Sequence, residues 1–166
     1  MRFYGLALLA SAAVLGACGG GGDKAKDTTA AAPAAPTAAA PAAPAAGGKA
    51  PMPATGDTVT IKMVGDDKGY RFEPNAVSIK EGQAVKFVMT TGGPHNVAFD
   101  PATTPAGGKD QLNANMTGQL SELSSPILMN PNEAYTISFA GVAPGKYDFH
   151  CTPHLAMNMK GTITVQ

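Results

Sequence analysis

The sequence has 166 residues, 14% of them charged, and its 12 lysines and arginines balance its 12 aspartates and glutamates. A chain of this length forms one domain or two. The neutral balance, without a run of basic residues, argues against nucleic-acid binding and against electrostatic attraction to anionic lipids. Two cysteines, Cys18 and Cys151, allow one disulfide at most, so a disulfide-rich scaffold is excluded.

The N-terminus has the pattern of a secretory signal. Arg2 supplies a positive charge before an apolar run over residues 3–14, which is too short to span a membrane. The next four residues, Leu-Gly-Ala-Cys at 15–18, resemble the lipobox of bacterial lipoproteins. The resemblance implies that residues 1–17 are a signal peptide and that Cys18 is lipidated. We therefore expect an exported protein held on a bacterial membrane by this anchor alone, facing the periplasm or the cell exterior. The alternative is an ordinary secreted protein with a chance cysteine.

After Cys18, residues 19–56 differ in composition from the rest of the chain. Residues 28–54 alone contain 14 alanines and 6 prolines. Alanine favours helix, but a proline every few residues removes backbone donors and clashes with the preceding turn. Residues 18–56 are therefore predicted to be the lipidated cysteine followed by a flexible Ala/Pro/Gly-rich linker, and residues 57–166 the folded domain.

Residues 57–166 alternate between apolar and polar side chains in several short runs. The apolar positions are Val59, Ile61 and Met63; Val77 and Ile79; Val85, Phe87 and Met89; Tyr135, Ile137 and Phe139; and Tyr147, Phe149 and Cys151. This period of two is typical of strands with one buried face. With a last strand at 162–165 and turn-rich connections, the pattern predicts an all-β antiparallel sandwich of about seven strands.

The segment from Asp100 to Glu133 interrupts this pattern. Within it, Leu112, Met116, Leu120 and Leu123 recur at spacings of four, four and three. This spacing predicts one short helix in the 100–133 region, although Gly118 disfavours it.

All the histidines lie at two places that also hold the domain's cysteine. His95 follows Pro94, and His150, Cys151 and His154 lie within five residues of one another. A thiolate and two imidazoles with a nearby thioether suit copper, because a trigonal His2Cys set with a weak axial methionine is the blue-copper site. Zinc prefers a fourth strong ligand or an open water position, and iron–sulfur clusters need more thiolates.

At these residues the sequence resembles the cupredoxins, in particular the plastocyanin and pseudoazurin group. The matching stretches are 72–74, 77–82, 93–100, 144–154 and 159–162. The resemblance implies a Greek-key β-sandwich that binds one copper ion, Cu(II) or Cu(I), through His95, Cys151, His154 and an axial methionine. It also implies that Asn96 hydrogen-bonds the backbone beside Cys151 and so fixes the site.

Two methionines compete for the axial position. Met159 has the Cys-x2-His-x4-Met spacing of plastocyanin and pseudoazurin, whereas Met157 has the x2 spacing of the related amicyanins. The family's axial methionine directly precedes the last strand, which favours Met159.

His150 neighbours Cys151 on a predicted strand and should point to the opposite face. It is therefore expected to be a surface residue and not a ligand, and the resemblance places it beside a partner-docking patch. His154 should be the ligand nearest the surface, with Pro94, Pro153 and Leu155 in a flat docking patch around it.

These features predict a type 1 blue copper protein that transfers single electrons and is not an enzyme. Its partners would be redox proteins such as c-type cytochromes or membrane oxidoreductases, and we expect a monomer. A periplasmic copper carrier or sensor is the alternative from another class. A thiol enzyme is disfavoured because Cys151 ends an apolar strand with Pro153 two residues on, and no glycine-rich oxyanion loop accompanies it. A multicopper oxidase is disfavoured because paired His-x-His motifs are absent.

Overall fold

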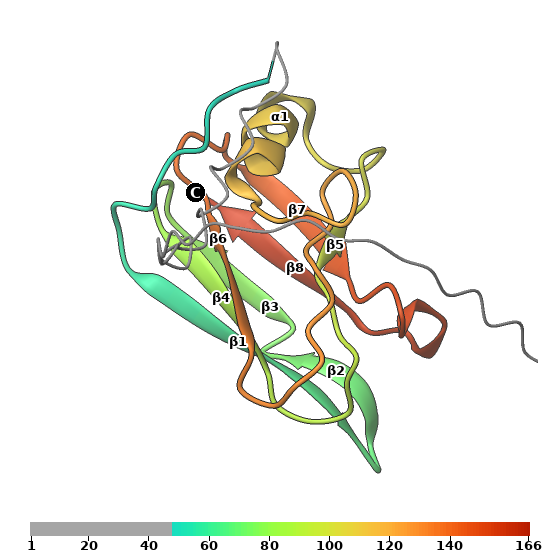
Figure 1. Cartoon of the computed structure of the whole chain (residues 1–166). Helices are drawn as coiled ribbons and strands as arrows, with labels where there is room; N and C mark the ends of the chain where they lie inside the picture. Colours follow the sequence, from blue (N-terminus) through green and yellow to red (C-terminus); the bar gives the residue numbers. More distant parts are fainter. Residues whose placement is uncertain (1–47) are drawn as a thin grey trace, which may run out of the picture. The chain divides into compact units, whose positions relative to one another are not determined.

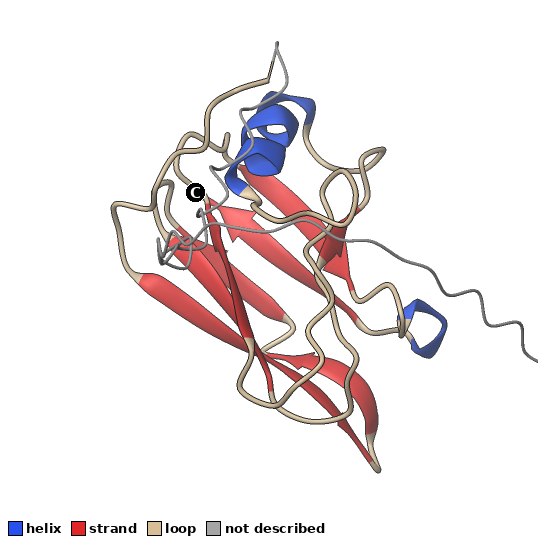
Figure 2. Cartoon of the chain, in the orientation of Figure 1, coloured by secondary structure: helices blue, strands red, loops and turns tan. Residues whose placement is uncertain are grey.

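A computed structural model describes residues 48–166 of the protein. They form two four-stranded β-sheets that pack face to face, with a helix at one end (Figures 1 and 2). The first sheet has the order β2-β1-β4-β6, which are Gly69–Glu73, Thr58–Asp66, Ala84–Met89 and Ala134–Ser138. The second has the order β3-β8-β7-β5, which are Ala76–Ile79, Lys160–Val165, Gly145–His150 and Ala98–Phe99. The helix α1 is Ala106–Asn115, and a 3₁₀ turn, η1, covers Leu155–Met157.

The alternating pattern of the sequence becomes the buried face of each sheet. In β1, Ile61 and Met63 are fully buried, whereas Thr60 and Lys62 between them are exposed. Successive side chains of a strand point to opposite faces, so the apolar set of each sheet meets the other sheet in one core. The predicted all-β sandwich with one short helix is confirmed.

The expected antiparallel pairing is only partly correct, because each sheet contains one parallel pair. β1 runs parallel to β4, and β3 runs parallel to β8. After β1 the chain forms β2 antiparallel to it, moves to the other sheet for β3, and returns as β4 beside β1. The chain through β2 and β3 is the long crossover connection that a parallel pair needs. The periodicity of the sequence does not indicate this pairing.

Aromatic rings fill the core next to β7. The ring of Phe149 meets the rings of Phe72 and Phe87 edge to face, with centroids 4.7 and 5.3 Å apart. Gly161 on β8 leaves room for Phe149, because a Cβ there would lie 2.4 Å from that ring. Phe149 therefore fixes the part of β7 that ends just before Cys151.

The predicted short helix forms within residues 100–133, but of the four regularly spaced apolar residues only Leu112 lies in it. The helix ends at Asn115, before Met116, and Leu120 lies in the following loop with 66% of its surface exposed. The side-chain oxygen of Asn113 accepts the backbone N–H of Leu123 at 2.9 Å, which draws the chain back toward the helix. Gly118 has φ = +63°, a left-handed conformation that a helix cannot contain.

Two residues that precede the predicted domain boundary at Gly56 are hydrogen-bonded to the helix α1. The side chain of Gln111 donates to the carbonyl of Ala50 at 2.9 Å, and the N–H of Met52 donates to the side-chain oxygen of Asn115 at 2.8 Å. The last part of the predicted linker is therefore hydrogen-bonded to α1. The predicted signal peptide, Cys18 and the linker up to residue 47 lie outside the described residues. Within residues 48–166 there is no helix of the length and apolarity needed to cross a bilayer.

Candidate metal centre

His95 lies in the loop between β4 and β5, and its ring is fixed by a hydrogen bond. Its Nε2 lies 2.9 Å from the carbonyl oxygen of Thr91. A carbonyl can only accept, so Nε2 carries the proton and the lone pair of Nδ1 is free. That Nδ1 lies 3.6 Å from Cys151 Sγ. The residue is fully buried, and this burial lowers the pKa of His95, which favours the neutral imidazole that a metal requires.

The backbone of His95 is held by the chain between α1 and β6. His95 and Leu128 exchange two backbone hydrogen bonds of 3.1 and 2.8 Å. Two residues on, Val97 donates to the Ser125 hydroxyl at 3.0 Å, and Ser125 donates back to the Val97 carbonyl at 2.9 Å. The segment between α1 and β6 therefore supports this histidine.

Cys151 directly follows β7 and is fully buried. The N–H of Cys151 donates to the carbonyl of Met159 at 3.0 Å, and the carbonyl of Cys151 accepts the N–H of His154 at 3.2 Å. These bonds close the loop that carries three of the predicted ligands. Burial raises the pKa of the Cys151 thiol, so the metal-free site favours the protonated form, and metal binding must release that proton.

His154 lies in this closed loop, just before η1. Its Nδ1 lies 3.5 Å from Cys151 Sγ, and its ring stacks on the ring of Tyr70, with centroids 3.7 Å apart and planes 15° apart. Burial, followed by the neighbouring His95, lowers the pKa of His154. With 6% of its surface exposed, against 0% for His95 and Cys151, it is the most accessible of the three, as predicted.

Asn96 joins the two loops that carry the histidines. Its side-chain oxygen accepts the N–H of Thr152, next to Cys151, at 2.7 Å. Its Nδ2 donates to the hydroxyls of Ser124 and Thr152, each at 3.2 Å. This is the contact that the resemblance implied, and it crosses 56 residues of sequence.

The three donor atoms have the spacing that one metal ion needs. Each of the three residues His95, Cys151 and His154 offers one ligand atom, and these three atoms lie within 4.8 Å of one another. All three residues are buried. Taking about 2.3 Å for a metal–sulfur bond and about 2.0 Å for a metal–nitrogen bond, a trigonal ion would separate sulfur from nitrogen by about 3.7 Å. The observed sulfur–nitrogen separations of 3.5 and 3.6 Å are close to that value, so the sulfur and each nitrogen are placed to bind one ion.

Residues 59–166 match the family model described as copper binding proteins, plastocyanin/azurin family. The chain belongs to this copper-binding family. Its site, with two imidazoles and one thiolate, is the donor set that suits copper.

Members of the plastocyanin/azurin family from plants and cyanobacteria are similar over the same region. A chloroplastic plastocyanin of Physcomitrium patens is 39% identical over 113 residues, which cover 68% of this chain and 60% of that protein. A plastocyanin of Nostoc punctiforme is 41% identical over 115 residues, 68% of this chain and 77% of that one. The structure of oxidized plastocyanin from the fern Dryopteris crassirhizoma, 31% identical, matches with a TM-score of 0.52 and covers 65% of this chain and all of that one.

The two methionines considered for the axial position differ in burial. The side chain of Met159 is fully buried directly before β8, whereas Met157 lies in η1 with 56% of its surface exposed. The N–H of Met159 donates to the carbonyl of His154 at 3.3 Å, so its backbone is part of the ligand loop.

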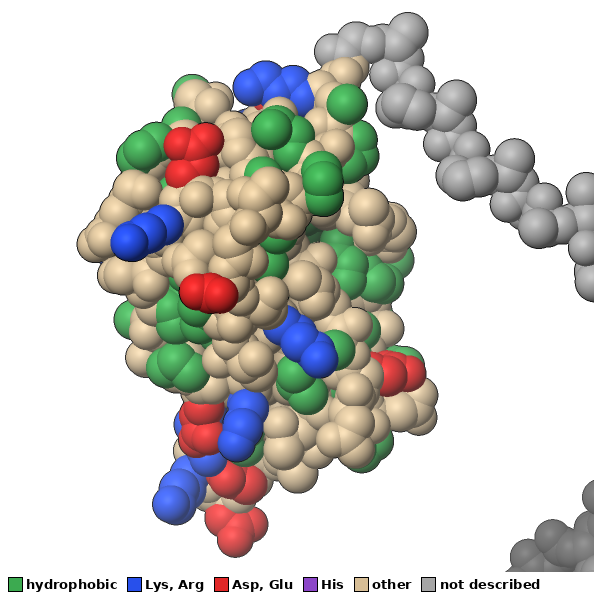
Figure 3. Space-filling view, turned by 90° about the vertical axis from the view of Figure 1, so that its left-hand side faces the viewer, with side chains coloured by type: hydrophobic (Ala, Val, Ile, Leu, Met, Phe, Trp, Pro, Cys, Tyr) green, Lys and Arg blue, Asp and Glu red, His purple; other side chains and the backbone are tan. Residues whose placement is uncertain are grey.

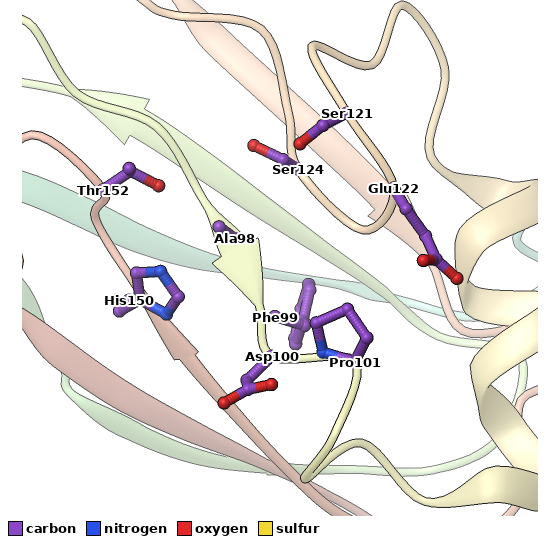
Figure 4. Close-up of a pocket in the computed structure, with 9 residues that line it drawn as sticks. All are labelled: Ala98, Phe99, Asp100, Pro101, Ser121, Glu122, Ser124, His150 and Thr152. Carbon is purple, nitrogen blue, oxygen red and sulfur yellow. The ribbon is translucent and has the colours of Figure 1, made fainter.

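His150 is not one of the three residues whose ligand atoms come together. It lines a shallow pocket of about 420 Å³ together with Asp100 and Glu122 (Figure 4). Burial lowers the pKa of His150, and the charge of Asp100 partly opposes this shift.

The residues predicted to form a docking patch lie at the surface. Pro94 and Pro153 are exposed, and Leu155 has 42% of its surface exposed. Tyr70 was missed by the sequence reasoning, although the alternation of Tyr70 and Phe72 after Gly69 was a signal for β2.

Proposed function

We propose that this protein carries single electrons on a type 1 copper centre formed by His95, Cys151 and His154, with Met159 as the axial ligand. The single observation that carries the proposal is the buried triangle of two imidazole nitrogens and one cysteine sulfur. The burial of Met159 and the exposure of Met157 support Met159 as the thioether ligand. When bound, copper supplies a one-electron couple between Cu(II) and Cu(I).

The chain's own contribution is to hold the donor atoms still while the charge changes. His95 is fixed by the carbonyl of Thr91, and the Cys151 loop is closed by its hydrogen bond to Met159. Asn96 ties the two loops together. A site held in this way needs little rearrangement between oxidation states, which keeps electron transfer fast.

The test of this proposal is spectroscopic. The purified protein is loaded with Cu(II), and its visible and EPR spectra are recorded beside those of Cys151→Ser. We expect an intense thiolate-to-copper band in the wild type and its loss in the variant. Absence of the band from the wild type would overturn the proposed site. Slow, freely reversible copper exchange without a reversible voltammetric wave would instead indicate a copper carrier or sensor.

We propose that redox partners, such as c-type cytochromes or membrane oxidoreductases, dock around His154. The exposure of the surrounding residues supports this proposal, because His154 reaches the surface between exposed Pro153 and Leu155. We expect Leu155→Glu to slow electron exchange with a redox partner at an unchanged copper spectrum. Leu120→Glu, at an exposed leucine in the loop after α1, is the matched control. Equal rates for the two variants would contradict docking at this patch.

We also propose export and lipid anchoring at Cys18, on the sequence pattern of residues 1–18 alone. We expect the full-length protein to take up labelled fatty acid in a bacterial host and to fractionate with membranes. Cys18→Ser should be unlabelled. Labelling of that variant would contradict the lipid site.

A further inference from the structure

The ring of Tyr70 lies flat against the imidazole of His154. The two centroids are 3.7 Å apart and the planes differ by 15°. The same Tyr70 ring meets His95 at 6.1 Å with the planes 66° apart. Tyr70 thus covers one face of His154 while the Nδ1 edge of that imidazole remains directed at Cys151 Sγ, 3.5 Å away.

The Tyr70 ring is itself held in place by the sheet. Tyr70 on β2 is paired with Gly65 on β1, and a Cβ at Gly65 would lie 2.7 Å from the Tyr70 ring. The missing side chain of Gly65 therefore leaves the space that the ring occupies. The next residue, Arg71, pairs with Asp66 at 2.7 Å, and Phe72 beyond it is anchored in the core. The ring is therefore positioned by β1 and β2 independently of any metal.

The orientation of the His154 imidazole depends on the Tyr70 ring more than the orientation of the His95 imidazole does. The Nε2 of His95 is fixed by the Thr91 carbonyl, whereas no hydrogen bond from a described residue reaches the Nε2 of His154. A side chain without such a bond can rotate unless packing prevents it. The stacked Tyr70 ring, together with the edge-to-face ring of His95 at 4.9 Å, restricts the tilt of the His154 imidazole.

We propose that Tyr70 is a positioning residue that orients His154 for the metal before the metal binds. This inference rests on the ligand role proposed for His154 above. Stacked aromatic pairs contribute an interaction that corresponds to about two- to tenfold in a binding constant. Loss of the ring should therefore weaken copper binding by about that factor, while the hydroxyl group of Tyr70 should matter little.

The experiment compares Tyr70→Leu, which removes the ring, with Tyr70→Phe, which keeps it. NMR of the metal-free full-length protein reads the carbon-bound ring protons of His154, which a stacked aromatic ring shifts upfield. We expect this upfield shift in the wild type and in Tyr70→Phe, and its loss in Tyr70→Leu. Competition with a chelator should give a copper dissociation constant about two- to tenfold weaker for Tyr70→Leu, and near the wild-type value for Tyr70→Phe.

The two arms separate this inference from the proposed function. If the wild type binds no copper while Tyr70→Leu loses the upfield shift, the ligand proposal fails and the stack remains. If copper binds with a thiolate band but Tyr70→Leu keeps both the shift and the wild-type affinity, the positioning role is overturned. The backbone amides of β4 and β6 serve as an internal control for folding. A Tyr70→Leu protein that loses these signals as well would show a general structural role, which also overturns the proposal.

Discussion

The two imidazoles of the centre are held by opposite means. His95 sits in a loop whose backbone is paired with Leu128, and its ring is fixed by a hydrogen bond to Thr91. His154 sits in a short loop that leads to the exposed residues of η1, and its ring is held by stacking on Tyr70. A hydrogen bond fixes one direction in the ring plane, whereas a stacked ring fixes the tilt and leaves the edge free. The first arrangement suits the buried side of the site and the second suits the side that a partner can approach.

The largest expected effect comes from removing the Asn96 side chain, which joins the loop of His95 to the loop of His154. Asn96→Ala removes all three hydrogen bonds of the Asn96 carboxamide and leaves the Thr152 N–H without its partner. We expect the free energy of unfolding to fall by about 3 kcal/mol, because a net hydrogen bond contributes about 1 kcal/mol and unpaired groups add a desolvation cost. Denaturant unfolding of the metal-free protein measures this change.

The control for this variant is Ser124→Ala, which removes only one of these three bonds, at 3.2 Å. Ser124→Ala should lower the free energy of unfolding by about 1 kcal/mol. Equal losses for the two variants would mean that Asn96 does not connect the loops.

A smaller effect is expected at Gly92, where the His95 loop approaches β1. Gly92, three residues before His95, has φ = +74°, and a Cβ there would lie 2.4 Å from the Cα of Gly65. Gly92→Ala should lower the free energy of unfolding by about 2 kcal/mol, from backbone strain and from the clash with a backbone atom that cannot rotate away.

Gly118→Ala separates these two causes. Gly118 has φ = +63°, but nothing lies within 4 Å of a Cβ built on it. Gly118→Ala should lower the free energy of unfolding by only about 1 kcal/mol, from the strained φ alone. A loss as large as that of Gly92→Ala would show that the close approach to Gly65 is unimportant.

Substitutions at Met159 and Met157 test which methionine is the axial ligand, with little change in the free energy of unfolding. Met159→Leu conserves apolar volume at a fully buried site, and Met157→Leu does so at an exposed one. We expect each to change the free energy of unfolding by less than about 1.5 kcal/mol. Only Met159→Leu should alter the EPR spectrum and the potential of the copper protein. A spectral change in Met157→Leu alone would reverse the assignment.

The sequence predicts the parts of this molecule that depend on local pattern. The period of two at Ile61 and Met63 marks a strand, and the spacing of Cys151 and His154 brings both side chains to one point. Both features arise from residues close together along the chain, so they can be recognised without the fold.

The parts that could not be predicted depend on contacts between distant segments. The parallel pairing of β1 with β4 leaves no periodic signal, and nothing in the composition of the 116–133 loop indicates that Leu128 pairs with His95. The end of α1 is set by the side chain of Asn113 reaching Leu123, ten residues away. The stacking of Tyr70 on His154 joins residues 84 positions apart through a strand that the sequence marked only weakly.

The smallest expected effect concerns the β1–β2 hairpin that carries Tyr70. Charged side chains gather at the lower end of the face shown in Figure 3, where this hairpin turns. Both carboxylate oxygens of Asp66 accept hydrogen bonds from Arg71, at 2.7 and 2.9 Å. The Arg71 guanidinium, together with the N–H of Lys68, lowers the pKa of Asp66 from 3.8 to about 2.

Because the folded-state pKa of Asp66 lies below its unfolded value, ionised Asp66 stabilises the fold above about pH 4, and this contribution is lost as the pH falls toward 2. Asp66→Asn should therefore melt slightly below the wild type at about pH 6, and the two melting temperatures should converge at about pH 2. Other carboxylates, including Glu73 on the same guanidinium, cancel in this difference because both proteins contain them. The pair is exposed and screened, so the gap should be small. Asp66 pairs with Arg71 next to Tyr70, whereas the adjacent Gly65 donates its N–H to the Thr91 carbonyl at 2.9 Å. The variant should therefore broaden the His154 ring signals in NMR spectra more than those of His95. Equal broadening at both histidines would show that the two sides of the centre are not supported independently.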